Sequence, residues 1–132
     1  DCGGKSELVD QSPSDCAIRE ASEETNGKLF DENDSIVNCQ RTLRTIFETS
    51  DIPTIYFKRS KYLLHLVKVP SKLLSMSLKR FGSAEEGDLS ISHKFRWKNI
   101  GSIRRLPIHV RFTCNVLIKE LEGIVKKNTI LK

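Results

Sequence analysis

One α-helix is delimited at both ends by the residues that flank it. In the sequence Ser-Pro-Ser-Asp at residues 12–15, the first serine is suited to cap the helix, the proline fits the first helical position, and the aspartate can complete a capping box. At the other end, Asn26 and Gly27 tolerate the left-handed backbone conformation with which many helices stop. The sequence therefore predicts a helix over residues 13–25.

Three glutamates share one arc of this predicted helix. At about 100° per residue, Glu20, Glu23 and Glu24 lie together, and the adjoining arc holds Ala17, Ile18, Ala21 and Thr25. One face can be buried while the next presents three carboxylates. Their mutual repulsion destabilises the helix by roughly a few tenths of a kcal/mol per pair. Mg²⁺ or Mn²⁺ would offset this repulsion, because both prefer carboxylate oxygens. The alternative interpretation is a solvated acidic helix face.

The same segment resembles the signature box of the Nudix hydrolases. That pattern reads glycine, five residues, glutamate, seven residues, and then R-E-U-x-E-E-x-G-U, where U is a bulky aliphatic residue. The start of the pattern resembles Gly3-Gly4-Lys5, its R-E pair resembles Arg19-Glu20, and its E-E pair resembles Glu23-Glu24. The resemblance covers about the first 28 residues of the chain.

The chain departs from the pattern at three positions. Five residues lead from Gly4 to Asp10 rather than to a glutamate, and eight residues rather than seven then separate Asp10 from Arg19. The closing glycine position is occupied by Asn26, which is a mild change because asparagine tolerates the left-handed conformation. The shifted loop gives no basis for assigning a role to Asp10.

The resemblance implies a hydrolase that splits a diphosphate linkage in a nucleoside diphosphate joined to another group, such as a dinucleotide, a nucleotide sugar or a capped RNA. Glu20, Glu23 and Glu24 would hold the Mg²⁺ or Mn²⁺, and Arg19 would orient one of these glutamates. The candidates for the general base are Glu23, Glu85 and Glu86. The residues expected to contact the substrate are Gly4, Lys5, Lys58 and Arg59.

The resemblance also implies an α/β fold, an α/β/α sandwich around a mixed sheet. Strands that precede the box form much of this sheet in the family, but only Asp1 and Cys2 precede Gly3 here. We therefore expect residues 1–132 to form a single partial domain that lacks its first strands. We also expect residues 36–47 to begin as a strand, and further strands to span 54–58, 62–69 and 91–100. Helices are expected over 71–81 and 107–127, and a loop over 82–89.

Charge is distributed unevenly along the chain. Residues 1–50 hold eleven acids and five bases, whereas residues 51–132 hold six acids and seventeen bases. This asymmetry is typical of a site where cations and a polyanion meet, although two solvated faces would give the same counts. A rival hypothesis is therefore a catalytically inactive Nudix-fold module that binds RNA or nucleotide through its basic half. A third is a structural domain that docks a partner through its C-terminal helix.

Single aromatic residues have two interpretations, whereas His65 has one. Tyr56 and Trp97 could stack on a nucleic-acid base, but a lone aromatic in a strand is more often part of the core. His65 alternates with aliphatic residues and is expected to be structural.

Composition excludes several classes of protein. With 38% hydrophobic residues in 132, the chain is long and apolar enough for a compact core, and its apolar runs are too short to span a bilayer. Its four cysteines have no C-x-x-C spacing, which argues against a zinc site and a disulfide framework. We therefore expect a reducing, intracellular and cytoplasmic setting, with no membrane partner.

Overall fold

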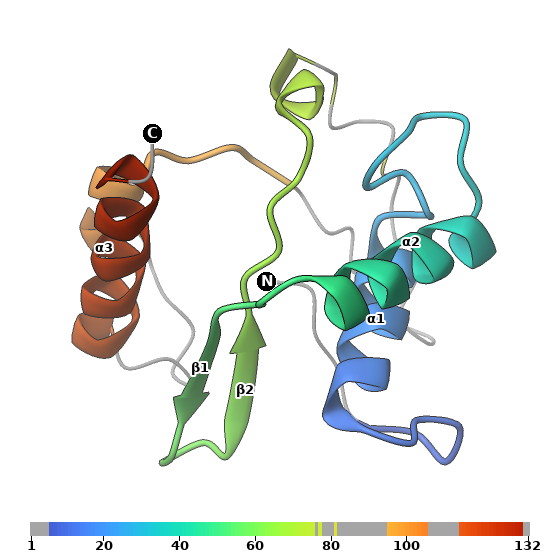
Figure 1. Cartoon of the computed structure of the whole chain (residues 1–132), viewed down its shortest axis with the longest axis horizontal. Coiled ribbons are helices and arrows are strands. Elements are labelled where there is room, and N and C mark those ends of the chain that lie inside the picture. Colours follow the sequence, from blue (N-terminus) through green and yellow to red (C-terminus); the bar gives the residue numbers. More distant parts are fainter. Residues whose placement is uncertain (1–5, 76, 78–80, 82–94, 106–113, 131–132) are drawn as a thin grey trace. The chain divides into compact units, whose positions relative to one another are not determined.

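The computed structural model describes residues 6–75, 77, 81, 95–105 and 114–130 (Figure 1). The chain divides into two compact units, the first formed by Asp1–Ile52 and Lys68–Arg96 and the second by Pro53–Val67 and Trp97–Lys132. The described residues combine helices with a small antiparallel sheet, which confirms a mixed α/β composition. The α/β/α sandwich and the single partial domain stay predictions.

Helix α1 spans Pro13–Glu24 and agrees with the predicted helix to within a residue. The Ser12 hydroxyl accepts a hydrogen bond from the backbone N–H of Asp15 at 3.1 Å and donates one to the Asp15 carboxylate at 2.9 Å. At the other end, Asn26 and Gly27 adopt left-handed conformations, with φ of 50° and 72°. The predicted start and stop signals are both confirmed.

Helix α2 spans Ile36–Thr49, so the prediction that residues 36–47 begin as a strand is wrong. Ser35 caps the helix, because its hydroxyl accepts a hydrogen bond from a backbone N–H of the first turn at 3.2 Å. Cys39 and Leu43 are the buried residues of α2 and lie four positions apart. This spacing is that of a helix face, not the two-residue period of a strand.

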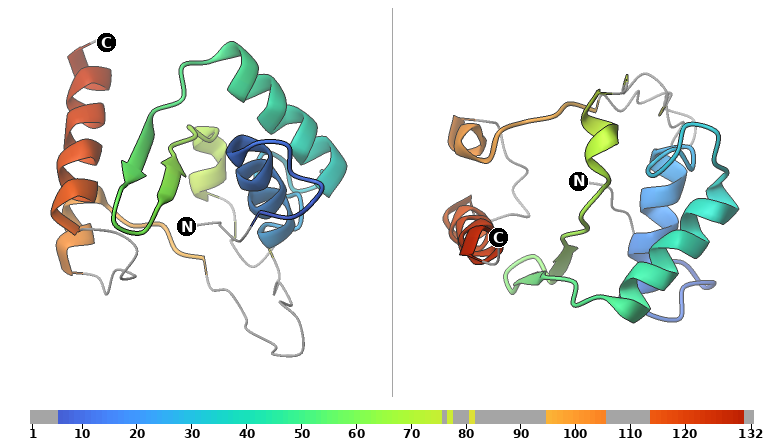
Figure 2. Two further views of the ribbon diagram at one scale, coloured as in Figure 1. Left: turned by 90° about the horizontal axis from the view of Figure 1, so that it is seen from below. Right: turned by 45° about the horizontal axis from the view of Figure 1, so that its top comes forward.

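In the first unit α1 and α2 lie side by side (Figures 1 and 2). Ser22 of α1 and Cys39 of α2 are fully buried, and burial raises the pKa of the Cys39 thiol despite its hydrogen bond with Ser22. The connection depends on Gly27, where a Cβ atom would lie 2.3 Å from the backbone carbonyl carbon of Ser35. Glycine is therefore needed here both for its φ and for lack of space.

The second unit is built on a β-hairpin. Strands β1 (Thr54–Phe57) and β2 (Tyr62–His65) pair antiparallel, shorter than the predicted strands 54–58 and 62–69. Helix α3 (Cys114–Ile130) runs alongside the hairpin (left view of Figure 2). The core of this unit consists of Ile55, Phe57 and Leu117, with Tyr62, Leu64, Leu66, Ile103 and Leu121 packed against it.

Other predicted elements are confirmed only in part. The 3₁₀ helix η1 (Ser71–Ser75) occupies the start of the predicted helix 71–81. Residues 95–99 have no regular structure and η3 (Ile100–Arg105) follows them, so the predicted strand 91–100 is wrong within this part. Trp97 is exposed like its neighbours, so the alternation in sequence does not correspond to alternating burial.

Some predictions fall outside the described residues. They are the loop 82–89 and parts of the predicted elements 71–81, 91–100 and 107–127. Within the described range, α3 confirms the second half of the predicted helix 107–127. None of the helices that the structure describes has the length and apolar character needed to cross a membrane.

Candidate active site

Arg19 of α1 lies at the centre of four carboxylates. Its Nε and Nη2 atoms donate hydrogen bonds to the two oxygens of Asp10, each at 3.1 Å. Its Nη1 atom lies 2.9 Å from Glu20, 3.1 Å from Glu23 and 3.6 Å from Glu7. When ionised, the four acids exceed the single guanidinium charge by three negative charges. The surroundings of Arg19 therefore favour the approach of a cation.

Burial distinguishes the predicted metal ligands from one another. The Glu23 side chain is 49% exposed, whereas that of Glu20 is 12% exposed and Glu24 is buried. The expectation of a helix face that presents all three carboxylates is thus wrong for Glu20 and Glu24. The pairing with Arg19 offsets part of the cost of burying Glu20, because a carboxylate paired with a guanidinium can be shielded from water.

Electrostatics separate Asp10 from Glu20. Hydrogen bonds from Arg19 hold the pKa of Asp10 below its ordinary value of 3.8. Burial raises the pKa of Glu20 above its ordinary value of 4.5, and the neighbouring Arg19 opposes this shift only in part. The hydrogen bonds with Asp10 also raise the pKa of Arg19, which stays charged. Glu20 is therefore the carboxylate beside Arg19 whose ionisation the fold disfavours.

Asp10 is a site residue to which the sequence assigned no role. The loop before α1 holds it in place, since the Glu7 N–H donates to Asp10 Oδ2 at 2.8 Å and the Asp10 N–H donates to the Glu7 carbonyl at 3.0 Å. The available signal was the glutamate that the box pattern places before its arginine. Asp10 stands near that position, displaced by the extra residue in the loop.

The carboxylate oxygens around Arg19 are chemically suited to Mg²⁺ or Mn²⁺, but their positions match a metal site less well. Carboxylate oxygens suit both ions, and Glu20 and Glu23 converge on a single nitrogen of Arg19. However, no three His, Cys, Asp or Glu side chains in the described ranges are arranged to hold a metal ion. Glu20 and Glu23 are thus brought together at Arg19, and a site formed by all three glutamates stays a prediction.

The remaining predicted site residues lie elsewhere. Gly4, Lys5, Glu85 and Glu86 fall outside the described residues. Lys58 and Arg59 are exposed in the turn between β1 and β2, in the second unit, whereas the glutamates belong to the first.

The single aromatic and histidine residues also differ in outcome. Tyr56 and Trp97 are exposed, so the interpretation that places them in the core is wrong. His65 lies in β2, where its Nδ1 forms a hydrogen bond with the Thr54 hydroxyl at 2.9 Å, and burial lowers its pKa. The position of His65 in a strand is therefore confirmed, and its structural role stays a prediction.

Comparison of the chain with protein-family models, curated proteins and solved structures gave no match. The candidate site is therefore defined by its own geometry. Its central feature is the arginine that joins Asp10 on one side to Glu20 and Glu23 on the other.

Proposed function

We propose that this chain is a divalent-metal-dependent hydrolase of the Nudix type. It would cleave a diphosphate linkage in a nucleoside diphosphate derivative such as a dinucleotide, a nucleotide sugar or a capped RNA, and its fold would be the α/β/α sandwich. The observation that carries the proposal is the convergence of Glu20 and Glu23 on Arg19 Nη1, at 2.9 and 3.1 Å. These are the R-E and E-E positions of the box that the sequence resembles.

Arg19 acts in this proposal as a positioning residue. Asp10 takes up the Nε and Nη2 donors, so the planar guanidinium has a fixed orientation. In that orientation Nη1 faces Glu20 and Glu23 and restrains the rotamers of both. Each of these carboxylates has a second oxygen, which can serve as a ligand. Arg19 thus holds two ligands in place through hydrogen bonds, without itself contacting the substrate.

Glu23 is the described residue best placed to accept a proton. It is half-exposed, which gives water access to it, whereas Glu20 and Glu24 are buried. A bound Mg²⁺ or Mn²⁺ would supply neutralisation of the diphosphate oxygens and a lowered pKa for a coordinated water. Glu86 stays a prediction for the general base.

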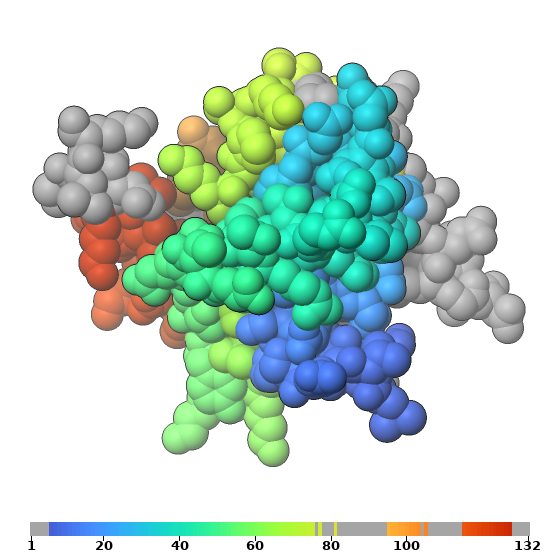
Figure 3. Space-filling model, turned by 45° about the vertical axis from the view of Figure 1, so that its right-hand side comes forward, coloured from blue at the N-terminus to red at the C-terminus, as the bar shows by residue number. Residues whose placement is uncertain are grey.

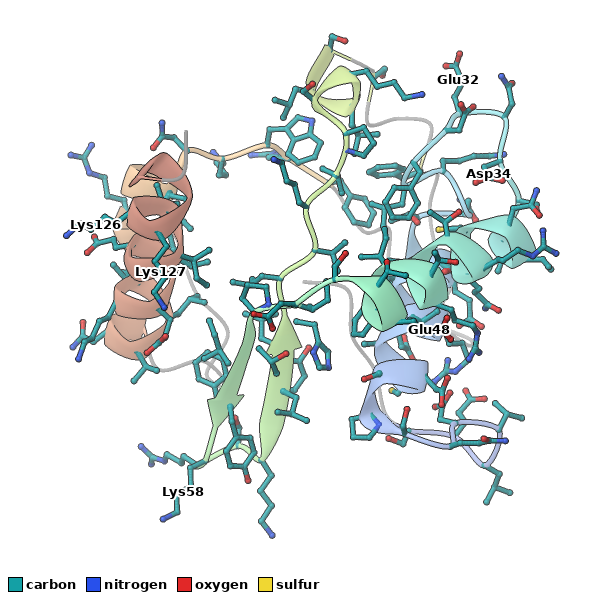
Figure 4. All side chains as sticks on the ribbon, in the orientation of Figure 1. Glu32, Asp34, Glu48, Lys58, Lys126 and Lys127 are labelled. Atoms are coloured by element: carbon teal, nitrogen blue, oxygen red, sulfur yellow. The ribbon has the colours of Figure 1, made fainter. Side chains whose placement is uncertain are left out.

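The proposal is tested with a panel of nucleoside diphosphate derivatives, with mononucleotide release followed by chromatography. We expect release in Mg²⁺ or Mn²⁺, none in EDTA, and a fall in kcat of about 10²- to 10⁴-fold in Glu23→Gln. The matched control is Glu32→Gln, because Glu32 is an exposed acid in the loop before α2 (Figure 4). Activity that survives both Glu23→Gln and Glu24→Gln would show that the site assignment is wrong.

A further inference from the structure

The two units of the chain have opposite charge. The second unit holds eleven Lys and Arg against two Asp and Glu, a net charge of +9. The first unit holds eleven Lys and Arg against fifteen Asp and Glu, a net charge of −4. A compact unit this basic attracts polyanions, because its summed field raises their local concentration.

The turn of the β-hairpin concentrates this charge. Three of its four residues, Lys58, Arg59 and Lys61, are basic and exposed. Among the described residues, these cations take part in none of the ion pairs, which instead involve Arg19, Arg44 and Lys72 of the first unit. Lys58 points away from the hairpin in Figure 4, and Figure 3 shows the atoms of the turn in green at the end of the hairpin.

Turn geometry does not account for these residue types. Hairpin turns favour Gly, Asn and Asp, and Lys61 occupies a left-handed position, with φ of 50°, where glycine or asparagine would be easier. Three like charges close together also repel one another. A ligand with several negative charges would offset that repulsion.

An aromatic ring lies on the outer face of the hairpin, next to the cations. Along β1 the side chains of Ile55 and Phe57 are buried, and Tyr56 between them is 56% exposed. Tyr56 pairs across the strands with Leu63, which is 37% exposed. Lys58 follows Tyr56 by two residues, about 7 Å or less along the chain, and begins the turn at the end of β1. An exposed ring beside cations is the combination that binds bases and phosphates together.

We propose that the turn and outer face of the β1–β2 hairpin form a binding site for single-stranded nucleic acid. A base stacks on Tyr56, and phosphates contact Lys58, Arg59 and Lys61. A single strand is favoured over a duplex because stacking requires an unpaired base. An anionic membrane is disfavoured because Tyr56 and Leu63 are the only large hydrophobic side chains that the β1–β2 hairpin exposes. This site requires neither a metal nor the α1 glutamates, so it goes beyond the proposed hydrolase.

The phosphate contacts are tested by fluorescence anisotropy of the full chain with a labelled oligouridylate of about 15 nucleotides. The triple variant Lys58→Gln, Arg59→Gln, Lys61→Gln should weaken binding about tenfold or more. It should also reduce the slope of log affinity against log salt concentration by about 2, because each of the three phosphate contacts contributes about 0.7 to that slope. The matched control removes three other exposed cations of the same unit, Lys119, Lys126 and Lys127, by substitution with glutamine. Equal losses in the two triple variants would overturn the proposal, because binding would then follow net charge alone.

The stacking contact is tested separately. Tyr56→Ala should weaken binding by about 5- to 150-fold with an unchanged salt slope, whereas Tyr56→Phe, which keeps the ring, should bind normally. Tyr56 is exposed, so circular dichroism should show the same fold in all three proteins. Unchanged affinity in Tyr56→Ala would refute the stacking site.

Two further measurements separate this inference from its rivals. Vesicles containing phosphatidylserine should bind more weakly than the oligouridylate, and binding to vesicles alone would overturn the proposal. EDTA and Glu23→Gln should leave the affinity for the oligouridylate unchanged. Loss of oligouridylate binding in EDTA or in Glu23→Gln would contradict a nucleic-acid site that is independent of the α1 glutamates. Loss of hydrolysis with unchanged binding would leave the nucleic-acid site supported.

Discussion

Asp10 and Arg19 are joined by two hydrogen bonds, from Nε to Oδ1 and from Nη2 to Oδ2, both 3.1 Å long. The Asp10 side chain is only 3% exposed, although it belongs to the loop before α1. This pair fixes the guanidinium that faces Glu20 and Glu23. The geometry of the candidate ligands on α1 therefore depends on an acid that lies outside the helix.

Asp10→Asn should loosen the candidate site without changing its shape. The variant keeps the size of the side chain but replaces a charged acceptor with a neutral amide, so Arg19 is held less firmly. We expect a lower melting temperature and an affinity for Mn²⁺ reduced about 10- to 100-fold, as for residues that orient metal ligands. The control is Asp51→Asn, an exposed aspartate in the first unit, which should change neither quantity. Similar effects in the two variants would refute the special role of Asp10.

Acid should remove the stability that Asp10 contributes. Its pKa in the folded protein lies below the ordinary value of 3.8, so between these two values the unfolded chain binds more protons. The contribution is fully present above pH 3.8 and is lost as the pH falls through the folded-state pKa. Urea unfolding of the metal-free protein at several acidic pH values should show a steeper loss of stability in the wild type than in Asp10→Asn. Parallel pH profiles would contradict this expectation.

The ionisation of Glu20 should affect stability in the opposite direction to that of Asp10. Burial raises the pKa of Glu20 above 4.5, so the folded protein loses stability as the pH rises above that value and the carboxylate ionises. The variant Glu20→Gln avoids this loss, and its free energy of unfolding in the absence of metal should exceed that of the wild type at neutral pH. The difference should disappear below pH 4.5. A variant less stable than the wild type at neutral pH would show that the pairing with Arg19 outweighs the cost of burial.

The elements that the sequence predicted well are those with local signals. The cap at Ser12 and the left-handed pair Asn26 and Gly27 determine α1 through contacts within a few residues. In α2 the β-branched residues Ile36 and Val37 favour a strand locally, whereas the cap at Ser35 and the packing against α1 favour the helix that forms. Local preference was therefore a poor guide where tertiary contacts decide the structure.

The candidate site shows the same division. Arg19, Glu20 and Glu23 were predicted from their spacing, because Glu20 adjoins Arg19 in the sequence and Glu23 lies one turn further along the same helix. Asp10 was missed because its contact with Arg19 depends on a loop whose path the spacing does not determine. The burial of Glu20 could not be predicted either, since it depends on how α1 packs.

Gly27 should be the least replaceable glycine among those that the structure describes. Its φ is 72°, and an added Cβ would lie within 2.6 Å of three backbone atoms of Ser35 and Ile36. Gly27→Ala should lower the free energy of unfolding by more than about 1 kcal/mol. Gly123→Ala is the control, because Gly123 lies inside α3 and an added Cβ would meet open space there. That variant should gain about 0.5–1 kcal/mol, and a loss similar to that of Gly27→Ala would contradict the structure.

Binding of Mn²⁺, measured from the paramagnetic resonance signal of the free ion, tests the proposed metal site most directly. The wild type should bind Mn²⁺ at one site. The double variant Glu23→Gln, Glu24→Gln should bind Mn²⁺ with an affinity reduced at least about 100-fold. The control is the double variant Glu32→Gln, Glu48→Gln, which removes two exposed acids of the same unit and should bind as the wild type does (Figure 4). Equal affinity in the two double variants would contradict a metal site on α1.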